Sequence, residues 1–227
     1  RHFPFSDAAE GEFRVATRMR GGVLDVAPEA DAAGRRTPGR PWPLLRDIDA
    51  DVLFEREAMT ITAQRGNIHG VAIREATARI ADLGHEPLLD VRGRAEGALA
   101  DMLAYVNASP VAQWTHAVTA QASARGAARL DLQLQIPLSQ ASGTRVGGTL
   151  HLQGNDLTLA DVPPFSRVTG ALNFDQNGVG FNNLAADFLG GATRFDATTR
   201  ADGTITINAT GMATVEGLRA ALAHDIA

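Results

Sequence analysis

Histidine, aspartate and glutamate are the first candidates for a reactive site in this sequence, because their side chains bind metals and transfer protons. The histidines are scattered, and none has the His-x-x-x-His spacing that pairs two imidazoles on one helix face. Asp47, Asp49 and Asp51 resemble the start of a calcium loop, but the glycine and bidentate glutamate of such a loop are missing. A spacing of two is more typical of the solvated face of a strand. The sequence therefore predicts no metal site.

Catalytic patterns are missing as well. The chain has no cysteine, no Gly-x-Ser-x-Gly elbow, no phosphate-binding loop and no dinucleotide fingerprint. Its formal charge of -5 and pI near 5.7 argue against nucleic-acid binding, which needs a basic surface. We expect no enzyme, no cofactor and no nucleic-acid partner. An enzyme acting on envelope glycans or lipids stays an alternative that a cleft of convergent carboxylates would support.

Apolar and polar residues alternate along most of the segments that would position a functional side chain. This period of two is the pattern of a half-buried strand. The clearest run extends from Leu130 to Ile136, and similar runs recur on both sides of it. Expected turns separate the runs, at Arg65-Gly66-Asn67, Asn177-Gly178 and Asp202-Gly203 among others. The chain is therefore predicted to be mainly β, an amphipathic antiparallel sheet.

Two segments have helical spacing instead. Residues 96–107 place Leu99, Met102 and Val106 three or four apart, as an amphipathic helix requires, and Ser109-Pro110 ends the pattern. Residues 214–226 have the same spacing, with Thr214 as the expected N-cap. The sequence thus predicts two short amphipathic helices beside the sheet.

An internal repeat is suggested by an offset of 120 residues, which places Glu96-Gly97 on Glu216-Gly217 and Phe54 on Phe174. We interpret residues 42–161 as one β-groove unit with its helix, 162–227 as a second, partial unit, and 1–41 as the tail of a preceding unit. Together they would form one continuous elongated domain. The alternative is two stretches of amphipathic sheet that share only their alternation.

Short motifs in a fixed order connect the chain to a known family. Together they resemble the YhdP family of large AsmA-like proteins over roughly residues 10 to 220. None of the motifs is catalytic, so the resemblance depends on their order and spacing: Trp42-Pro43-Leu44-Leu45, Met59-Thr60-Ile61, Ile80-Ala81-Asp82-Leu83, Ile136-Pro137-Leu138, Gly170-Ala171-Leu172-Asn173-Phe174 and Leu189-Gly190-Gly191.

This resemblance implies a periplasmic protein that one N-terminal helix anchors in the inner membrane of Gram-negative bacteria. It also implies a sheet bent into a groove, or taco-like half-barrel, which carries phospholipids between the inner and outer membranes. No run of about 18 apolar residues and no signal peptide occur in the chain, which begins at Arg1. We interpret it as an internal fragment of such a protein; a trimmed cytoplasmic protein is the alternative.

Apolar residues at strand spacing are the candidate lipid-binding surface. Their expected partners are phospholipid acyl chains and neighbouring repeat units of the same chain, and the fragment is expected to be monomeric. A structural β-sandwich whose apolar faces are wholly buried is the competing hypothesis, since such stripes usually form ordinary core. The candidate residues are Ile48, Val52, Phe54, Ile68, Leu130, Leu132, Leu134, Ile136, Leu150, Leu152, Val168, Leu172, Phe174, Phe188, Ile205 and Ile207.

Overall fold

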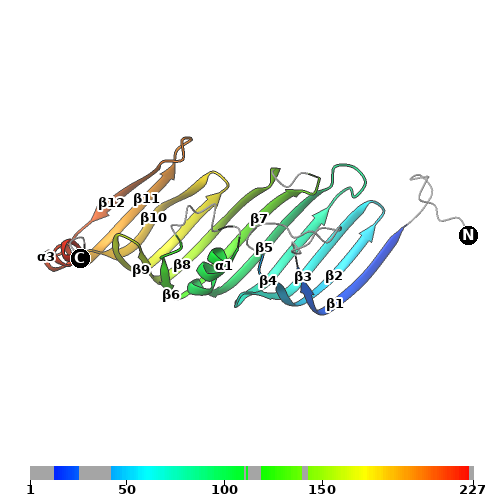
Figure 1. The fold of residues 1–227 in the computed structure, drawn as a ribbon, viewed down its shortest axis with the longest axis horizontal. Coiled ribbons are helices and arrows are strands. Elements are labelled where there is room, and N and C mark those ends of the chain that lie inside the picture. The colour runs from blue at the N-terminus through cyan, green and yellow to red at the C-terminus, as the bar shows by residue number, and fades with distance from the viewer. Residues whose placement is uncertain (1–12, 26–41, 110, 112–118, 140–142, 225–227) are drawn as a thin grey trace, which may run out of the picture.

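The strands form a single 12-stranded sheet in the computed structural model, which describes residues 13–25, 42–109, 111, 119–139 and 143–224 (Figure 1). Consecutive strands pair antiparallel in the order β1-β2-β3-β4-β5-β7-β8-β9-β10-β11-β12, and the short β6 pairs with β8. Their bounds are β1 Arg14–Leu24, β2 Leu45–Glu55, β3 Ala58–Ile68, β4 Val71–Ile80, β5 Leu88–Ala98, β6 Ser123–Arg125, β7 Ala127–Pro137, β8 Arg145–Leu159, β9 Val162–Asp175, β10 Gly178–Phe188, β11 Gly191–Thr199 and β12 Ile205–Gly211.

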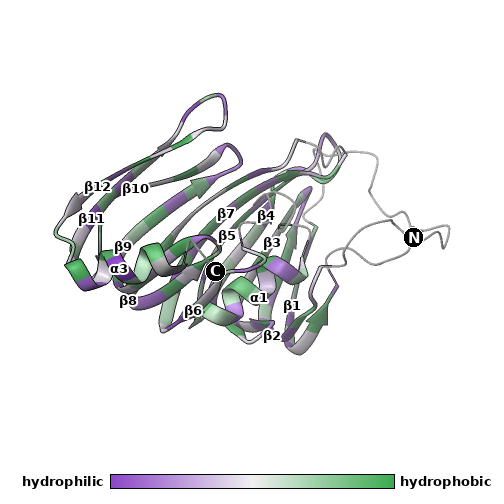
Figure 2. Cartoon of the chain, turned by 60° about the vertical axis from the view of Figure 1, so that its left-hand side comes forward, coloured by the Kyte–Doolittle hydropathy of each residue, from purple (hydrophilic) through white to green (hydrophobic). Residues whose placement is uncertain are grey.

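In the described part of the chain, this architecture confirms the predicted mainly β, antiparallel fold with two short helices. Apolar and polar residues alternate along the strands (Figure 2), so one face of the sheet is apolar. The sheet is open, with β1 and β12 as its edge strands.

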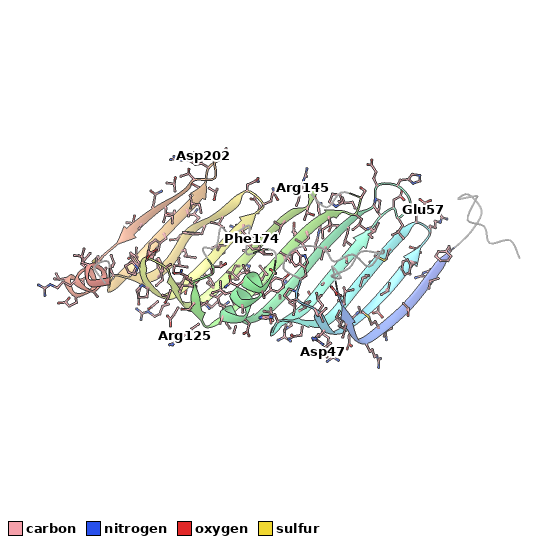
Figure 3. All side chains as sticks on the ribbon, in the orientation of Figure 1. Asp47, Glu57, Arg125, Arg145, Phe174 and Asp202 are labelled. Carbon is pink, nitrogen blue, oxygen red and sulfur yellow. The ribbon has the colours of Figure 1, made fainter. Side chains whose placement is uncertain are left out.

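Helices α1, Leu99–Ala108, and α3, Val215–His224, lie toward the same ends of the strands (Figure 1). We call this row of strand ends the helix edge and the opposite row of strand ends the open edge. Neither name refers to the edge strands β1 and β12. Figure 3 marks both: Asp47 and Arg125 lie along the helix edge, and Glu57, Arg145 and Asp202 along the open edge. None of the helices in the described part of the chain is long and apolar enough to cross a membrane.

Helix bounds differ slightly from those predicted. Strand β5 continues to Ala98, so α1 begins three residues later than residue 96, and Ser109 caps its end as expected. Pairing between β5 and β7 holds these residues extended, because Ala98 lies opposite Ala127. Thr214 is the N-cap of α3, as predicted, because its Oγ1 accepts the Gly217 N–H at 3.0 Å. Pro110, residues 225–227, and residues 1–12 and 26–41 of the expected tail lie outside the described residues.

One predicted turn is wrong. Arg65-Gly66-Asn67 lies inside β3, at an irregularity where Arg65 faces Asp49 while Ala63 faces Ala50. The chain turns instead at His69 and Gly70, both of which have positive φ (51° and 88°). A glycine with positive φ suits the second position of such a tight turn. The local sequence contains turn-forming residues at both places, and strand pairing selects between them.

Candidate functional site

Every residue predicted for a lipid-binding surface lies on one face of the sheet. The pairing register shows this, because residues directly opposite each other on neighbouring strands point to the same side. Leu134, for example, faces Val91 on β5 and Val146 on β8. Leu172 faces Leu150 on β8 and Phe181 on β10. The alternation in the sequence is therefore converted into one apolar surface that continues from strand to strand.

Irregularities in the strands keep this surface in phase. A slip of one residue moves every later side chain to the other face, so an extra residue must be absorbed in a β-bulge. Asp47, Arg167 and Asn183 have positive φ values of 52°, 54° and 57°. Each lies where the register of its strand shifts, in β2, β9 and β10 respectively. The bulges thus allow apolar residues on both sides of them to share one face.

A buried strip, which we call the core strip, follows the helix edge. Leu99 and Met102 of α1 are 3% and 8% exposed, and they belong to one cluster with buried residues from β4, β7, β8, β9, β10 and β11. Phe165 stacks on Phe188 with ring centroids 4.7 Å apart, and both contact Phe195 edge-on. The core strip comprises Val71, Leu99, Met102, Ala128, Leu152, Val168, Leu184, Ala186 and Phe195.

A second apolar row lies nearer the open edge and is only half-buried. We call it the open strip. Its members stand directly opposite one another across six strands, from β2 to β8, so the row is uninterrupted. Exposed apolar rows of this extent are uncommon on soluble proteins and usually contact another molecule. The open strip comprises Val52, Ile61, Ala78, Val91, Leu134 and Val146.

The candidate residues differ in burial, and four of them belong to the two strips. Leu152 and Val168 belong to the core strip, and Ile48 is also buried. Val52 and Leu134 belong to the open strip, while Ile205 and Ile207 on β12 are 48% and 59% exposed. The remaining candidates are half-buried on the same face: Phe54, Ile68, Leu130, Leu132, Ile136, Leu150, Leu172, Phe174 and Phe188.

Four members of the open strip were not among the candidates: Ile61, Ala78, Val91 and Val146. The alternation in Met59-Thr60-Ile61 and in Leu89-Asp90-Val91 carries the signal for two of them. Val146 likewise begins an alternating run that continues to Leu152, whereas the small Ala78 stands out only once its cross-strand neighbours Ile61 and Val91 are known.

Phe174 lies between the two strips near the middle of the apolar face (Figure 3). Its ring covers Gly148 of β8, where a Cβ would lie 2.6 Å from Phe174 Cζ and 2.7 Å from the Asp131 carbonyl oxygen. No side chain larger than hydrogen fits there without displacing its neighbours. Gly148 therefore allows a large aromatic ring to lie flat against the sheet at this point.

The opposite face of the sheet is polar and rich in ion pairs. Asp49 accepts the Gly21 N–H at 2.9 Å and Arg65 Nε at 2.6 Å, and these bonds hold its pKa below the ordinary value. Arg18 Nε, 2.6 Å from Asp51, lowers the pKa of that carboxyl in the same way. Asp49 and Asp51 therefore occupy a solvated strand face, as their spacing indicates.

A second polar group surrounds Asp131 on β7. Burial alone would raise its pKa, but hydrogen bonds from Arg94 at 3.2 Å and His151 at 2.9 Å outweigh that effect and lower it. Arg129 adds a contact at 3.6 Å. Exposed pairs of this kind contribute at most about 1 kcal/mol each to the free energy of unfolding. They therefore help to select the pairing register of neighbouring strands and add little to stability.

Among the described residues, Glu57, Asp82 and His85 are the single trio that could share a metal ion, with ligand atoms within 4.8 Å of one another. They lie at the open edge, and Asp82 already accepts the backbone N–H groups of Gly84 and His85 at 2.7 and 3.0 Å. Glu57 is distant from the other two in sequence, so spacing alone did not reveal the trio.

Comparison with known proteins gives one clear result. A family model described as YhdP protein matches residues 1–227. No curated protein and no solved structure matches the chain significantly.

Proposed function

Because the chain belongs to the YhdP family, we propose that it is a non-catalytic segment of a periplasmic bridge anchored in the inner membrane. Its apolar sheet face guides phospholipids between the inner and outer membranes. The carrying observation is the open strip, an apolar row that crosses six strands and stays half-buried.

Acyl chains suit this surface for a simple energetic reason. Each CH₂ group removed from water contributes about 0.8 kcal/mol, without needing a directional contact. Along a row of aliphatic side chains, the total binding free energy of a tail is therefore large, while each single contact contributes little. The tail can slide along the row because no single contact fixes its position. The polar opposite face, with the Asp49, Asp51 and Asp131 groups, keeps the other side of the sheet in water.

The repeated arrangement of strands supports a further part of the proposal, that residues 42–161 and 162–227 are two units of one continuous domain. With an offset of 120 residues, the bounds of β3 coincide with those of β10, and β4 and β11 begin at equivalent residues. Asp47 and Arg167, and likewise His69 and Leu189, are equivalent pairs with positive φ. Such units would extend the apolar face into neighbouring units of the same chain.

A structural envelope module is the competing function, and the core strip favours it, because Leu152 and Val168 are only 3% and 1% exposed. The single-sheet arrangement of the described strands supports the groove instead, since a closed sandwich needs a second sheet to cover the first.

Photo-crosslinking in cells tests the proposal. A photoreactive residue at Leu134 or Leu172, on the apolar face, is expected to capture phospholipid, and lipid should co-purify with the protein. Gln133, the neighbour of Leu134 on the polar face, is the matched control and should capture none. Absence of lipid at Leu134 and Leu172, together with absence of co-purifying phospholipid, would exclude the function.

A further inference from the structure

Leu99 and Met102 of α1 pack in the core strip, and no residue of the open strip belongs to that cluster. We infer that α1 is a fixed partition: it reserves the core strip for the protein's own side chains and leaves the open strip as the path for an acyl chain. This inference rests on the proposed function and specifies which part of the surface carries it.

Both ends of α1 are attached to the rest of the fold. At its start, the Leu99 N–H donates to the Gly126 carbonyl at 2.9 Å. Near its end, the Asn107 side-chain amide donates to the Thr119 carbonyl at 2.9 Å, and Thr119 Oγ1 donates back to Asn107 Oδ1 at 2.8 Å. A helix held at both ends cannot lift without breaking these bonds.

Asn155 secures the segment to which the start of α1 is bonded. Its side chain is fully buried and donates to the carbonyls of Arg125 and Ala127, both at 3.1 Å, while its oxygen accepts the Gln153 N–H at 2.8 Å. Gly126, between the two carbonyls, has a φ of 95°, and a Cβ there would lie 2.7 Å from Asn155 Nδ2. The joint is therefore built from residues that leave little room for movement.

The underside of α1 fills the surface beneath it. Leu99 and Met102 are buried against the core strip. Tyr105, one turn further on, is also largely withdrawn from solvent, and burial raises its pKa to about 12. No room for an acyl chain remains where Leu99 and Met102 pack in one cluster with Val71, Ala128 and Leu152.

The open strip is long enough for a lipid tail. Six neighbouring strands span five spacings of about 4.8 Å, or about 24 Å in total. One tail extends through half of a hydrocarbon core about 30 Å thick, or about 15 Å. A tail laid across the strands is therefore accommodated within the open strip without entering the core strip.

A disulfide lock tests whether the partition is fixed. A Cβ on Gly70 would lie 3.6 Å from Asp101 Cβ in the first turn of α1, within the range of about 3.5–4.5 Å found in disulfides. The chain has no other cysteine, so Gly70→Cys with Asp101→Cys gives one defined crosslink. The reduced form of the same variant is the matched control, because it carries the same cysteine at the positive φ of residue 70 but lacks the crosslink.

Lipid capture is then measured in the locked protein with vesicles of phosphatidylethanolamine and phosphatidylglycerol. The photoreactive residue is placed at Leu134 in the open strip or at Leu130, a half-buried leucine of the same strand that packs against the core strip. Capture at Leu134 should exceed that at Leu130 by about tenfold, which corresponds to about 1.4 kcal/mol. Oxidised and reduced proteins should capture equally at Leu134.

Three results would contradict the inference, and they are distinguishable. Loss of capture at Leu134 on oxidation would make α1 a gate that must lift. Equal capture at Leu130 and Leu134 would show that lipid enters beneath α1. Failure of both positions to capture lipid, in either redox form, would overturn the proposed function itself.

Discussion

Helices α1 and α3 are both ten residues long and both lie at the helix edge, yet they differ in burial. Leu99 and Met102 of α1 are 3% and 8% exposed, whereas Leu218 and Leu222 of α3 are 45% and 64% exposed. Helix α1 contacts β5 and β6 and shares a buried cluster with Ala128 of β7 and Leu152 of β8, while α3 contacts the turn at Leu189 and Gly190. The comparison teaches that an amphipathic helix supplies half of an interface, and its burial depends on the strands beside it.

Leucine truncation should produce the largest difference between the two helices. Leu99→Ala is expected to lower the free energy of unfolding by about 2–5 kcal/mol, because it opens a cavity in the core strip. Leu218→Ala, on the exposed helix, should change it by about 0.5 kcal/mol or less. Urea denaturation of both variants measures the pair, and equal losses would refute the contrast in burial.

Alkaline pH provides a second test of α1 packing. Burial raises the pKa of Tyr105 to about 12, whereas the unfolded value is about 10. The resulting stability is complete below about pH 10 and disappears as the pH rises through about 12, because the unfolded chain releases its proton first. Two pKa units correspond to about 2.7 kcal/mol at most.

Tyr105→Phe should remove this decline between about pH 10 and 12. The chain has one tyrosine, no lysine and no cysteine, so no other side chain of these types titrates in the same alkaline range. Tyrosinate absorbance of the native protein should titrate near the raised value. An ordinary titration would mean that the Tyr105 hydroxyl is not buried in the folded protein.

The joint beside α1 should be the next most sensitive position. Asn155→Ala leaves the carbonyls of Arg125 and Ala127 and the Gln153 N–H without their partner, at a cost of about 1–3 kcal/mol. Asn173→Ala on the exposed polar face, where Asn173 accepts Thr149 Oγ1, is the control and should cost less. Hydrogen exchange should show faster opening of α1 only in the Asn155 variant.

Capping should give the smallest effect and should act on α3. Thr214→Ala removes the acceptor of the Gly217 N–H and is expected to cost about 1 kcal/mol in helix stability. The N-cap of α1, Ala98, has no side-chain cap, because strand pairing and the Gly126 carbonyl already hold that end. Ala98→Ser should therefore have little effect, and circular dichroism with thermal unfolding measures both variants.

Much of the fold could be predicted because alternation is a local property. Runs such as Leu130 to Ile136 and the spacing of Leu99 and Met102 identified strands and helices directly. The turn at Arg65-Gly66-Asn67 was wrong, because pairing with β2 and β4 extends β3 through these residues. Bulges at Asp47 and Arg167 have no comparable signal, since neither position is a glycine, the residue type that marks a positive φ in a sequence.

The sequence by itself determined the secondary structure class, the amphipathic character of each strand and the exclusion of known catalytic motifs. Only the tertiary structure decided which apolar residues are core and which stay half-buried. Leu134 and Leu152 have the same side chain and the same alternation, yet one belongs to the open strip and the other lies beneath α1. The reason is physical: burial depends on what packs against a residue from distant parts of the chain, and local pattern carries no information about that.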